Sequence, residues 1–185
     1  MKSSWVKLLL ETIVVALIMF FIFHPRGVKA DDRIISEENI HSIIDKKLNL
    51  VYIFTDWCGA CRETLHDFYG SKALKNKDLD VNIILIGANH AKKDEYLELK
   101  EASEIDLPIY LLENTDLLSL KAITDHPRIE NFIKSNFTNY GELNFNGVPI
   151  TFYADENLTI IGQGARTYNT LMQDVKRFKN SFDLE

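Results

Sequence analysis

The sequence predicts an α/β fold in which a mixed central sheet is flanked by helices. Short apolar runs of strand length alternate with amphipathic segments of helical period, which is typical of parallel strands joined by crossover helices. The last two apolar runs are separated only by Asp155-Glu156-Asn157, so they predict an antiparallel hairpin that makes the sheet mixed. The chain has 185 residues, of which 46% are hydrophobic, and this is enough for one sizeable core.

Residues 1–30 differ in character from the rest and indicate an export segment. Two lysines precede an apolar stretch. Its uninterrupted part, 13–23, has the length of a signal-peptide core, whereas residues 5–23 would form about 28 Å of helix, enough to cross a bilayer. The segment is therefore a cleaved signal peptide or an N-terminal membrane anchor. We expect the domain at 31–185 to be periplasmic or otherwise extracytoplasmic, and anchored in the inner membrane if residues 5–23 stay attached.

The charge of the chain argues against a nucleic-acid partner. The formal net charge is −6 at pH 7, and the export segment is itself basic, so the domain that follows is more acidic still. A nucleic-acid-binding protein needs a basic surface to neutralise phosphates, and here lysines and arginines are scattered along the predicted helices. We therefore expect no nucleic-acid partner.

The domain begins with a predicted helix followed by a buried strand. Ser36 is a suitable N-cap, the two glutamates after it suit the first turn, and the isoleucines that follow recur at helical spacing. A helix is therefore expected over 36–48. Residues 49–55 form a run of apolar, β-branched and aromatic residues between turn formers, which predicts a buried strand.

Two further helix–strand pairs follow this strand. Apolar residues recur at helical spacing over 61–75, which predicts an amphipathic helix bent at Gly70. The apolar run at 80–89 predicts a second strand. A polar-faced segment at 92–105 predicts a surface helix, and the run at 107–114 predicts a third strand.

The last third of the chain is predicted to contain a helical stretch, the hairpin and a closing helix. Residues 113–141 are expected to be helical, with Pro127 where a helix begins and Gly141 where one ends. The two strands of the hairpin are expected at 147–155 and 158–165. An amphipathic helix at 167–180 closes the domain.

The only two cysteines, Cys58 and Cys61, come directly after the strand at 49–55. A structural zinc site needs four nitrogen or sulfur ligands, and the five histidines stand at no paired ligand spacing, so we expect no metal. A purely structural disulfide is also disfavoured. Closing a four-residue loop stabilises by about 2 kcal/mol in the chain-entropy model, against nearly 5 kcal/mol for a long loop.

The position of the cysteine pair favours redox chemistry. Cys58 adjoins the N-terminus of the predicted helix, where unpaired N–H groups and the helix dipole stabilise a thiolate. Cys61 falls about one turn later, nearer the core, so the exposed sulfur would attack and the inner one would resolve. Trp57 is either a core aromatic residue or a shield on one side of the Cys58 sulfur. Arg62 either adds positive charge nearby or is a solvated helix position.

Two motifs resemble the thioredoxin superfamily. "DWCGACRE" resembles its W-C-x-x-C active site, and "NGVPITFYADENLTIIGQG" resembles its second signature, in which a cis-proline faces the cysteine pair. The resemblance covers residues 36–180 and implies a thioredoxin-like fold. It implies that Pro149 is cis and that Val148 and Pro149 dock the substrate chain beside Cys58. It implies no metal, nucleotide or organic cofactor.

Within the superfamily, the export segment and the strand at 107–114 resemble membrane-anchored, extracytoplasmic TlpA/ResA-like proteins. Ala60 replaces the proline of the typical thioredoxin dipeptide, and Tyr52 stands where thioredoxins carry a buried acid. The stretch at 113–141 is longer than in a minimal member and is interpreted as a helical insertion before the cis-proline loop. That insertion, and the valine before the proline, also resemble DsbA-like oxidants.

Together these features predict an extracytoplasmic thiol–disulfide oxidoreductase in which Cys58 attacks and Cys61 resolves. The reductive direction is favoured. The alternatives are a DsbA-like oxidant that introduces disulfides and a non-catalytic binding or chaperone module with the same fold. The expected partners are proteins with disulfides or thiols and a membrane redox partner that recycles the pair.

Overall fold

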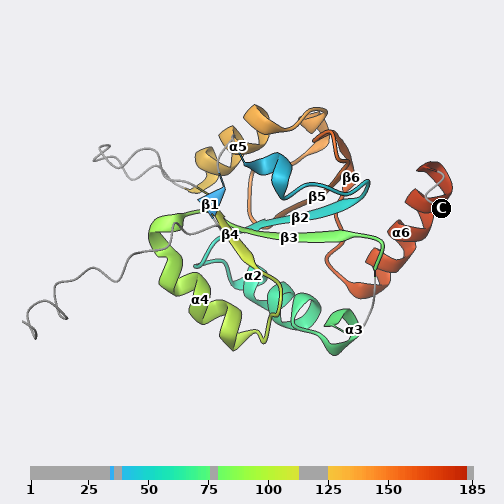
Figure 1. Cartoon of the computed structure of the whole chain (residues 1–185). Helices are drawn as coiled ribbons and strands as arrows, with labels where there is room; N and C mark the ends of the chain where they lie inside the picture. Colours follow the sequence, from blue (N-terminus) through green and yellow to red (C-terminus); the bar gives the residue numbers. More distant parts are fainter. Residues whose placement is uncertain (1–33, 36–38, 76–78, 113–124, 183–185) are drawn as a thin grey trace, which may run out of the picture. The chain divides into compact units, whose positions relative to one another are not determined.

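The computed structural model of the protein describes residues 34–35, 39–75, 79–112 and 125–182, which belong to one compact unit (Figure 1). The predicted export segment at 1–30 lies outside the described residues. In the part of the chain that the structure describes, no helix has the length and apolar character needed to cross a membrane.

A six-stranded sheet forms the centre of the described unit. Its strands run in the order β1-β4-β3-β2-β5-β6. The first four strands in this order are parallel, whereas β5 is antiparallel to both β2 and β6. The strands are β1 (Ile34–Ile35), β2 (Asn49–Phe54), β3 (Asn82–Gly87), β4 (Ile109–Leu112), β5 (Ile150–Ala154) and β6 (Ile160–Gln163). The mixed sheet and the C-terminal hairpin are therefore confirmed.

Helices cover both faces of the sheet (Figure 1). Alternate residues of β2 point to opposite faces, so Tyr52 belongs to one buried cluster and Val51 to the other. The first cluster includes residues of the helices α2 (Gly59–Thr64), η2 (Leu65–Tyr69), α4 (Lys93–Ala102) and α6 (Tyr168–Phe182). The second includes residues of η1 (Ile40–Ser42) and α5 (Asp125–Asn136).

The predicted helix over 36–48 is wrong in extent, because among the described residues of this range, 39–48, the structure has only the 3-10 helix η1. The Nδ2 group of Asn82 donates a hydrogen bond to the carbonyl of Ile43 at 2.8 Å. The Nδ2 group of Asn49 donates one to the carbonyl of Lys46 at 2.5 Å. Side chains of β2 and β3 thus take the carbonyls that a longer helix would use internally. The predicted N-cap lies outside the described residues.

The helix predicted over 61–75 is confirmed as an interrupted helix. It begins as α2, continues through the π-helical turn η2, and resumes as α3 (Lys72–Lys75) after a break at Gly70. A Cβ atom at Gly70 would lie 2.0 Å from the carbonyl oxygen of Ser103, so only glycine allows the chain to pass so close to the end of α4. Together α2 and η2 make one continuous helical segment that starts directly after Cys58.

The stretch at 113–141 is described only from residue 125 onwards. Pro127 lies in the first turn of α5, as predicted, but the helix ends at Asn136, and Gly141 lies instead in the 3-10 helix η4 (Tyr140–Glu142). Ile129 and Ile133 of α5 are fully buried against the sheet. These residues cover the sheet, and the interpretation of the whole stretch as a helical insertion stays a prediction.

Candidate active site

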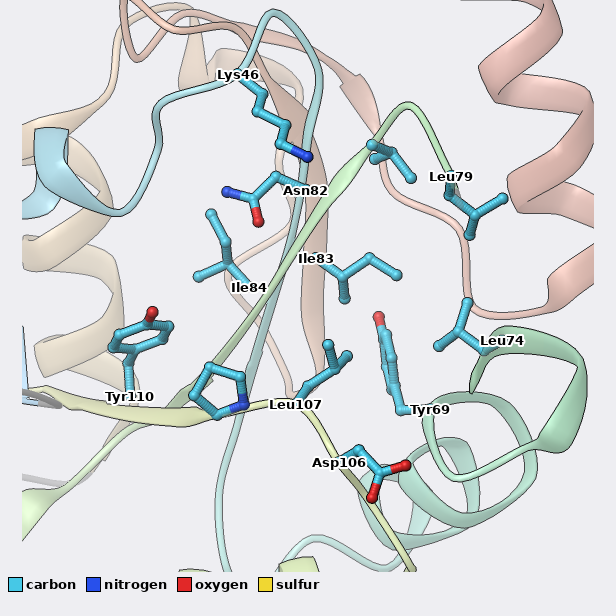
Figure 2. Close-up of a pocket in the computed structure, with 12 residues that line it drawn as sticks. Lys46, Tyr69, Leu74, Leu79, Asn82, Ile83, Ile84, Asp106, Leu107 and Tyr110 are labelled. Atoms are coloured by element: carbon cyan, nitrogen blue, oxygen red, sulfur yellow. The ribbon is translucent and has the colours of Figure 1, made fainter. Parts of the chain in front are cut away.

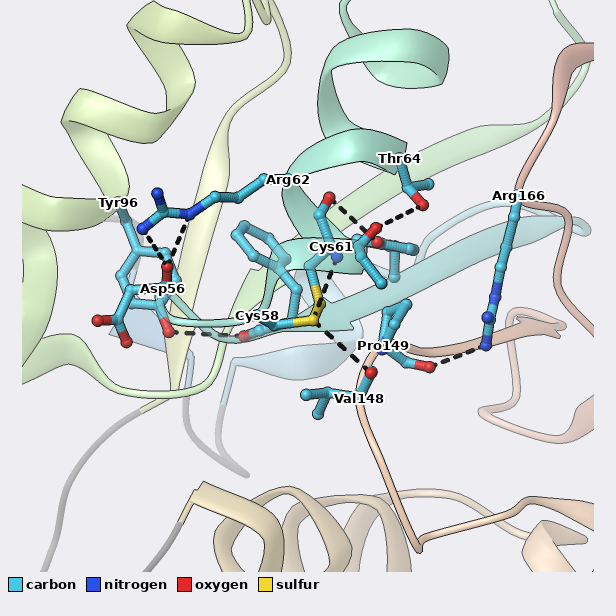
Figure 3. The surroundings of a disulfide bond; sticks show 12 residues. Asp56, Cys58, Cys61, Arg62, Thr64, Tyr96, Val148, Pro149 and Arg166 are labelled. Carbon is cyan, nitrogen blue, oxygen red and sulfur yellow. Dashed lines mark hydrogen bonds between the residues drawn. A yellow bond between two sulfur atoms is a disulfide. The ribbon is translucent and has the colours of Figure 1, made fainter.

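The two cysteines form a disulfide bond at the start of α2 (Figure 3). Cys58 is the N-cap residue, and its sulfur accepts a hydrogen bond from the backbone N–H of Cys61 at 3.1 Å. The two sulfurs differ in access, because Cys58 is 6% exposed whereas Cys61 is completely buried. Cys58 thus caps the helix and Cys61 lies within it, and their attacking and resolving roles stay a prediction.

The cis-proline loop faces the cysteine pair. The Val148–Pro149 peptide bond is cis, as the resemblance predicted, and the carbonyl oxygen of Val148 lies 3.6 Å from the Cys58 sulfur (Figure 3). Pro149 is buried and Val148 is half-buried. The two sequence motifs, 90 residues apart, therefore meet at one site.

Trp57 is not part of the core. Its side chain is 56% exposed, so the interpretation as a core aromatic residue is wrong. Because it directly precedes Cys58, it places a large apolar ring on the surface next to the disulfide. An exposed apolar side chain beside a reactive group is suited to contact with another molecule.

Arg62 supports the loop that leads into the cysteine pair. Its Nε and Nη2 groups donate hydrogen bonds to the backbone carbonyl of Asp56 at 3.1 and 2.8 Å. The carboxylate of Asp56 forms an ion pair with Lys92 at 2.9 Å. Arg62 is exposed, as a solvated helix position would be, and its guanidinium also links α2 to the loop before it.

Arg166 holds the cis-proline loop by a hydrogen bond, and no sequence motif indicated this residue. Its Nη2 group donates a hydrogen bond to the carbonyl of Pro149 at 2.9 Å (Figure 3). Gly164 brings this segment close to β5, because a Cβ atom at Gly164 would lie 2.2 Å from Oγ1 of Thr151. The only sequence signal is the pattern Gly164-Ala165-Arg166, in which a glycine ends the hairpin and a charged residue follows.

Two tyrosines lie beneath the disulfide. The hydroxyl of Tyr52 is 3.5 Å from the carbonyl oxygen of Cys61, and the ring of Tyr69 lies 4.9 Å from that of Tyr52. Burial raises the pKa of Tyr52 to about 12, although Thr64 and the charge of Arg166 oppose that rise. At neutral pH Tyr52 is therefore a neutral hydrogen-bond donor and cannot act as a base in the way a carboxylate could.

No residues suited to a metal gather at this site. Within the described ranges, no three or more His, Cys, Asp or Glu side chains are placed to hold a metal ion. A cavity of about 370 Å³ lies elsewhere, between residues of β3 and the segment that leads into β4 (Figure 2). Its lining includes the first residues of β3, whereas Cys58 follows the last residue of the parallel strand β2, so cavity and disulfide are at opposite ends of the sheet.

Solved structures of other proteins share this fold. The thioredoxin domain of a thiol-disulfide oxidoreductase from Bacteroides vulgatus matches over 75% of this chain and 83% of its own, with 17% identity and a TM-score of 0.51. A thioredoxin-related protein from Neisseria meningitidis serogroup B matches over 76% of this chain and 90% of its own, with 16% identity and a TM-score of 0.52. No protein-family model matches the sequence, and no curated protein does. The chain therefore has a thioredoxin-like fold, and that prediction is confirmed.

Proposed function

We propose that the protein is an extracytoplasmic thiol–disulfide oxidoreductase with Cys58 and Cys61 as its redox pair. The observation that carries the proposal is the placement of the disulfide. Cys58 is the N-cap of α2 and is 6% exposed, Cys61 is completely buried one turn later, and the carbonyl of Val148 lies beside the Cys58 sulfur. A matched structure is itself described as the thioredoxin domain of a thiol-disulfide oxidoreductase, which supports the same chemistry here.

In the reductive direction the reduced pair transfers two electrons to a substrate disulfide. The Cys58 thiolate attacks one substrate sulfur, so a Cys58–substrate disulfide forms and the other substrate sulfur leaves as a thiolate that takes up a proton. Cys61 then loses its proton and its thiolate attacks the Cys58 sulfur. The second substrate thiol is released, and the pair becomes the Cys58–Cys61 disulfide that the structure contains.

The surroundings of the pair suit both steps. The N–H of Cys61 and the start of the helix stabilise negative charge on Cys58, which favours the thiolate of the reduced form. Trp57, Val148 and Pro149 supply the docking surface, with the carbonyl of Val148 available to pair with an extended substrate chain. Because Cys61 is completely buried, its sulfur reacts only with the neighbouring Cys58 sulfur and not with the substrate.

Direction and location complete the proposal. The resemblance to TlpA/ResA-like proteins favours reduction of exported proteins, with a membrane redox partner that returns the pair to the dithiol. An equilibrium reduction potential near that of thioredoxin, about −270 mV, would support this direction, whereas a value near −120 mV would support the DsbA-like oxidant. The apolar sequence within residues 1–30, which predicts an export segment, supports an extracytoplasmic location.

Insulin reduction by dithiothreitol tests the activity itself. The protein should accelerate precipitation of the insulin B chain, and the Cys58→Ser variant should not. Far-ultraviolet circular dichroism of both proteins controls for folding. If the parent protein and the Cys58→Ser variant give the same rate as dithiothreitol alone, the chain is a binding or chaperone module.

A further inference from the structure

Arg166 lies in the active-site region but has no carboxylate partner within the described part of the chain. Its side chain is exposed, and the interaction the structure gives it is the hydrogen bond to the carbonyl of Pro149. Two other cations, Lys92 and Arg177, do have carboxylate partners, in Asp56 and Asp174. The charge of Arg166 is thus left uncompensated in a chain whose net charge is negative.

The hydrogen bond to Pro149 leaves most of the guanidinium free to bind something else. A guanidinium group carries five N–H bonds in a planar fork, and Nη2 of Arg166 uses one of them on the carbonyl oxygen. The remaining N–H groups match the two oxygens of a carboxylate. Because the bond to Pro149 limits the freedom of the side chain, less rotamer entropy is lost when a second partner binds.

The position of Arg166 fits a partner that passes the cis-proline loop. In Figure 3, Pro149 lies between the Cys58 sulfur and the guanidinium of Arg166. A substrate chain that pairs with Val148 would place its cysteine at Cys58 and would run on past Pro149. Successive side chains of such an extended chain rise by about 3.3 Å, so a residue a few positions from the substrate cysteine would reach the guanidinium.

We propose that Arg166 is a specificity-determining residue that selects substrate proteins carrying an aspartate or glutamate a few residues from the reacting cysteine. This inference rests on the proposed function. It names the class of protein substrate, namely acidic segments around a disulfide. The exposed position implies a modest preference that salt weakens.

The test compares reduction of two peptide disulfides by the reduced protein. The peptides have the same length and differ only in carrying aspartate or lysine at the positions two and three residues from each cysteine. The parent protein should reduce the acidic peptide with a kcat/KM about two- to five-fold higher, as expected for an exposed charge pair. Arg166→Met should abolish this ratio, Arg166→Lys should keep part of it, and Arg166→Glu should favour the basic peptide.

Arg177→Met is the matched control. It also removes one arginine from the acidic chain, but Arg177 lies on α6 and pairs with Asp174, so the peptide ratio should stay at the parent value. If the parent protein reduces both peptides at the same kcat/KM, the inference about Arg166 is wrong, while the proposed function stands. Equal slowing of both peptides in Arg166→Met, or the same ratio in Arg166→Glu as in the parent, would also overturn it. Failure of the parent to reduce either peptide would instead refute the proposed function.

Discussion

The two faces of the central sheet are packed with different chemistry. The face covered by α2, η2, α4 and α6 buries both cysteines and four tyrosines, whereas the buried cluster on the face covered by η1 and α5 consists of aliphatic residues, alanines and phenylalanines among the described residues. The tyrosines are Tyr52, Tyr69, Tyr96 and Tyr153. Rings of the first face are in contact, such as Tyr52 with Tyr69 at 4.9 Å.

The difference indicates that the cysteine-bearing face supports the active site, whereas the aliphatic face supports the stability of the fold. Two tyrosine hydroxyls on the cysteine-bearing face reach main-chain or charged atoms, that of Tyr52 at the carbonyl of Cys61 and that of Tyr153 at the carboxylate of Asp174. The side chains of the aliphatic cluster, such as Ile129 and Ile133, carry no polar atoms and contribute by packing. Substitutions on the first face should therefore change redox chemistry or its pH dependence, and those on the second face should change stability only.

Loss of the attacking sulfur should give the largest effect. Cys58→Ser should lower the rate of insulin reduction at least about a thousand-fold, because the serine hydroxyl does not form the mixed disulfide. Its free energy of unfolding should fall by only about 2 kcal/mol, since the lost disulfide closes a short loop. Urea titration measures the second quantity. A variant that keeps most of the insulin reduction rate, or whose free energy of unfolding falls far more than this, would contradict the distinction between the two faces.

A substitution that creates a cavity on the aliphatic face should lower stability and leave activity nearly unchanged. Ile133→Ala should reduce the free energy of unfolding by about 2–5 kcal/mol, because Ile133 is fully buried between α5 and the sheet. Urea denaturation gives the loss. The insulin reduction rate per folded molecule should stay within about two-fold of the parent, and a large fall in that rate would show that the second face acts on the site.

The pKa of Tyr52 should make stability depend on pH in the alkaline range. Burial raises this pKa to about 12 in the folded protein, against about 10 in the unfolded chain, so the unfolded state releases its proton first. The stabilising contribution is fully present below pH 10 and is lost as the pH rises towards 12. In the oxidised protein, Tyr52→Phe should flatten the decline of unfolding free energy by up to about 1.4 kcal/mol per pH unit. If the slope of unfolding free energy against pH is the same in Tyr52→Phe as in the parent, the pH dependence arises from another group than Tyr52.

Removal of the Arg62 brace should have the smallest effect. Arg62→Met deletes two hydrogen bonds to the carbonyl of Asp56 at an exposed position, so the free energy of unfolding should fall by about 1 kcal/mol. Hydrogen exchange should increase locally in the loop before α2. Lys134→Met, which breaks an exposed ion pair on α5 with Glu130, is a control that should leave exchange in this loop unchanged.

The cysteine pair and the cis-proline could be predicted because each belongs to a motif that is local in the sequence. Cys58 and Cys61 lie three positions apart after a strand, and Pro149 directly precedes β5. The alternation of strands and helices was recovered for the same reason, since strand and helix periods are local properties of the chain.

Features that depend on contacts across the fold could not be predicted in this way. The helix expected over 36–48 stops early because Asn82, on β3, donates a hydrogen bond to the carbonyl of Ile43. Arg166 was missed because its role is a hydrogen bond to Pro149, 17 residues earlier, made by a side chain in an otherwise unremarkable polar turn. The exposure of Trp57 is likewise a property of the folded chain and not of a local sequence period.

Trapping the mixed disulfide tests the central claim most directly. The reduced Cys61→Ser and Cys58→Ser variants are mixed separately with glutathione disulfide, and the adducts are mapped by mass spectrometry over time. The Cys61→Ser variant should rapidly form a glutathione adduct on Cys58, because Cys58 caps α2 and is the more exposed of the two cysteines, whereas the completely buried Cys61 of the other variant should react far more slowly. Equal or faster reaction at Cys61 would contradict the assignment of Cys58 as the attacking residue.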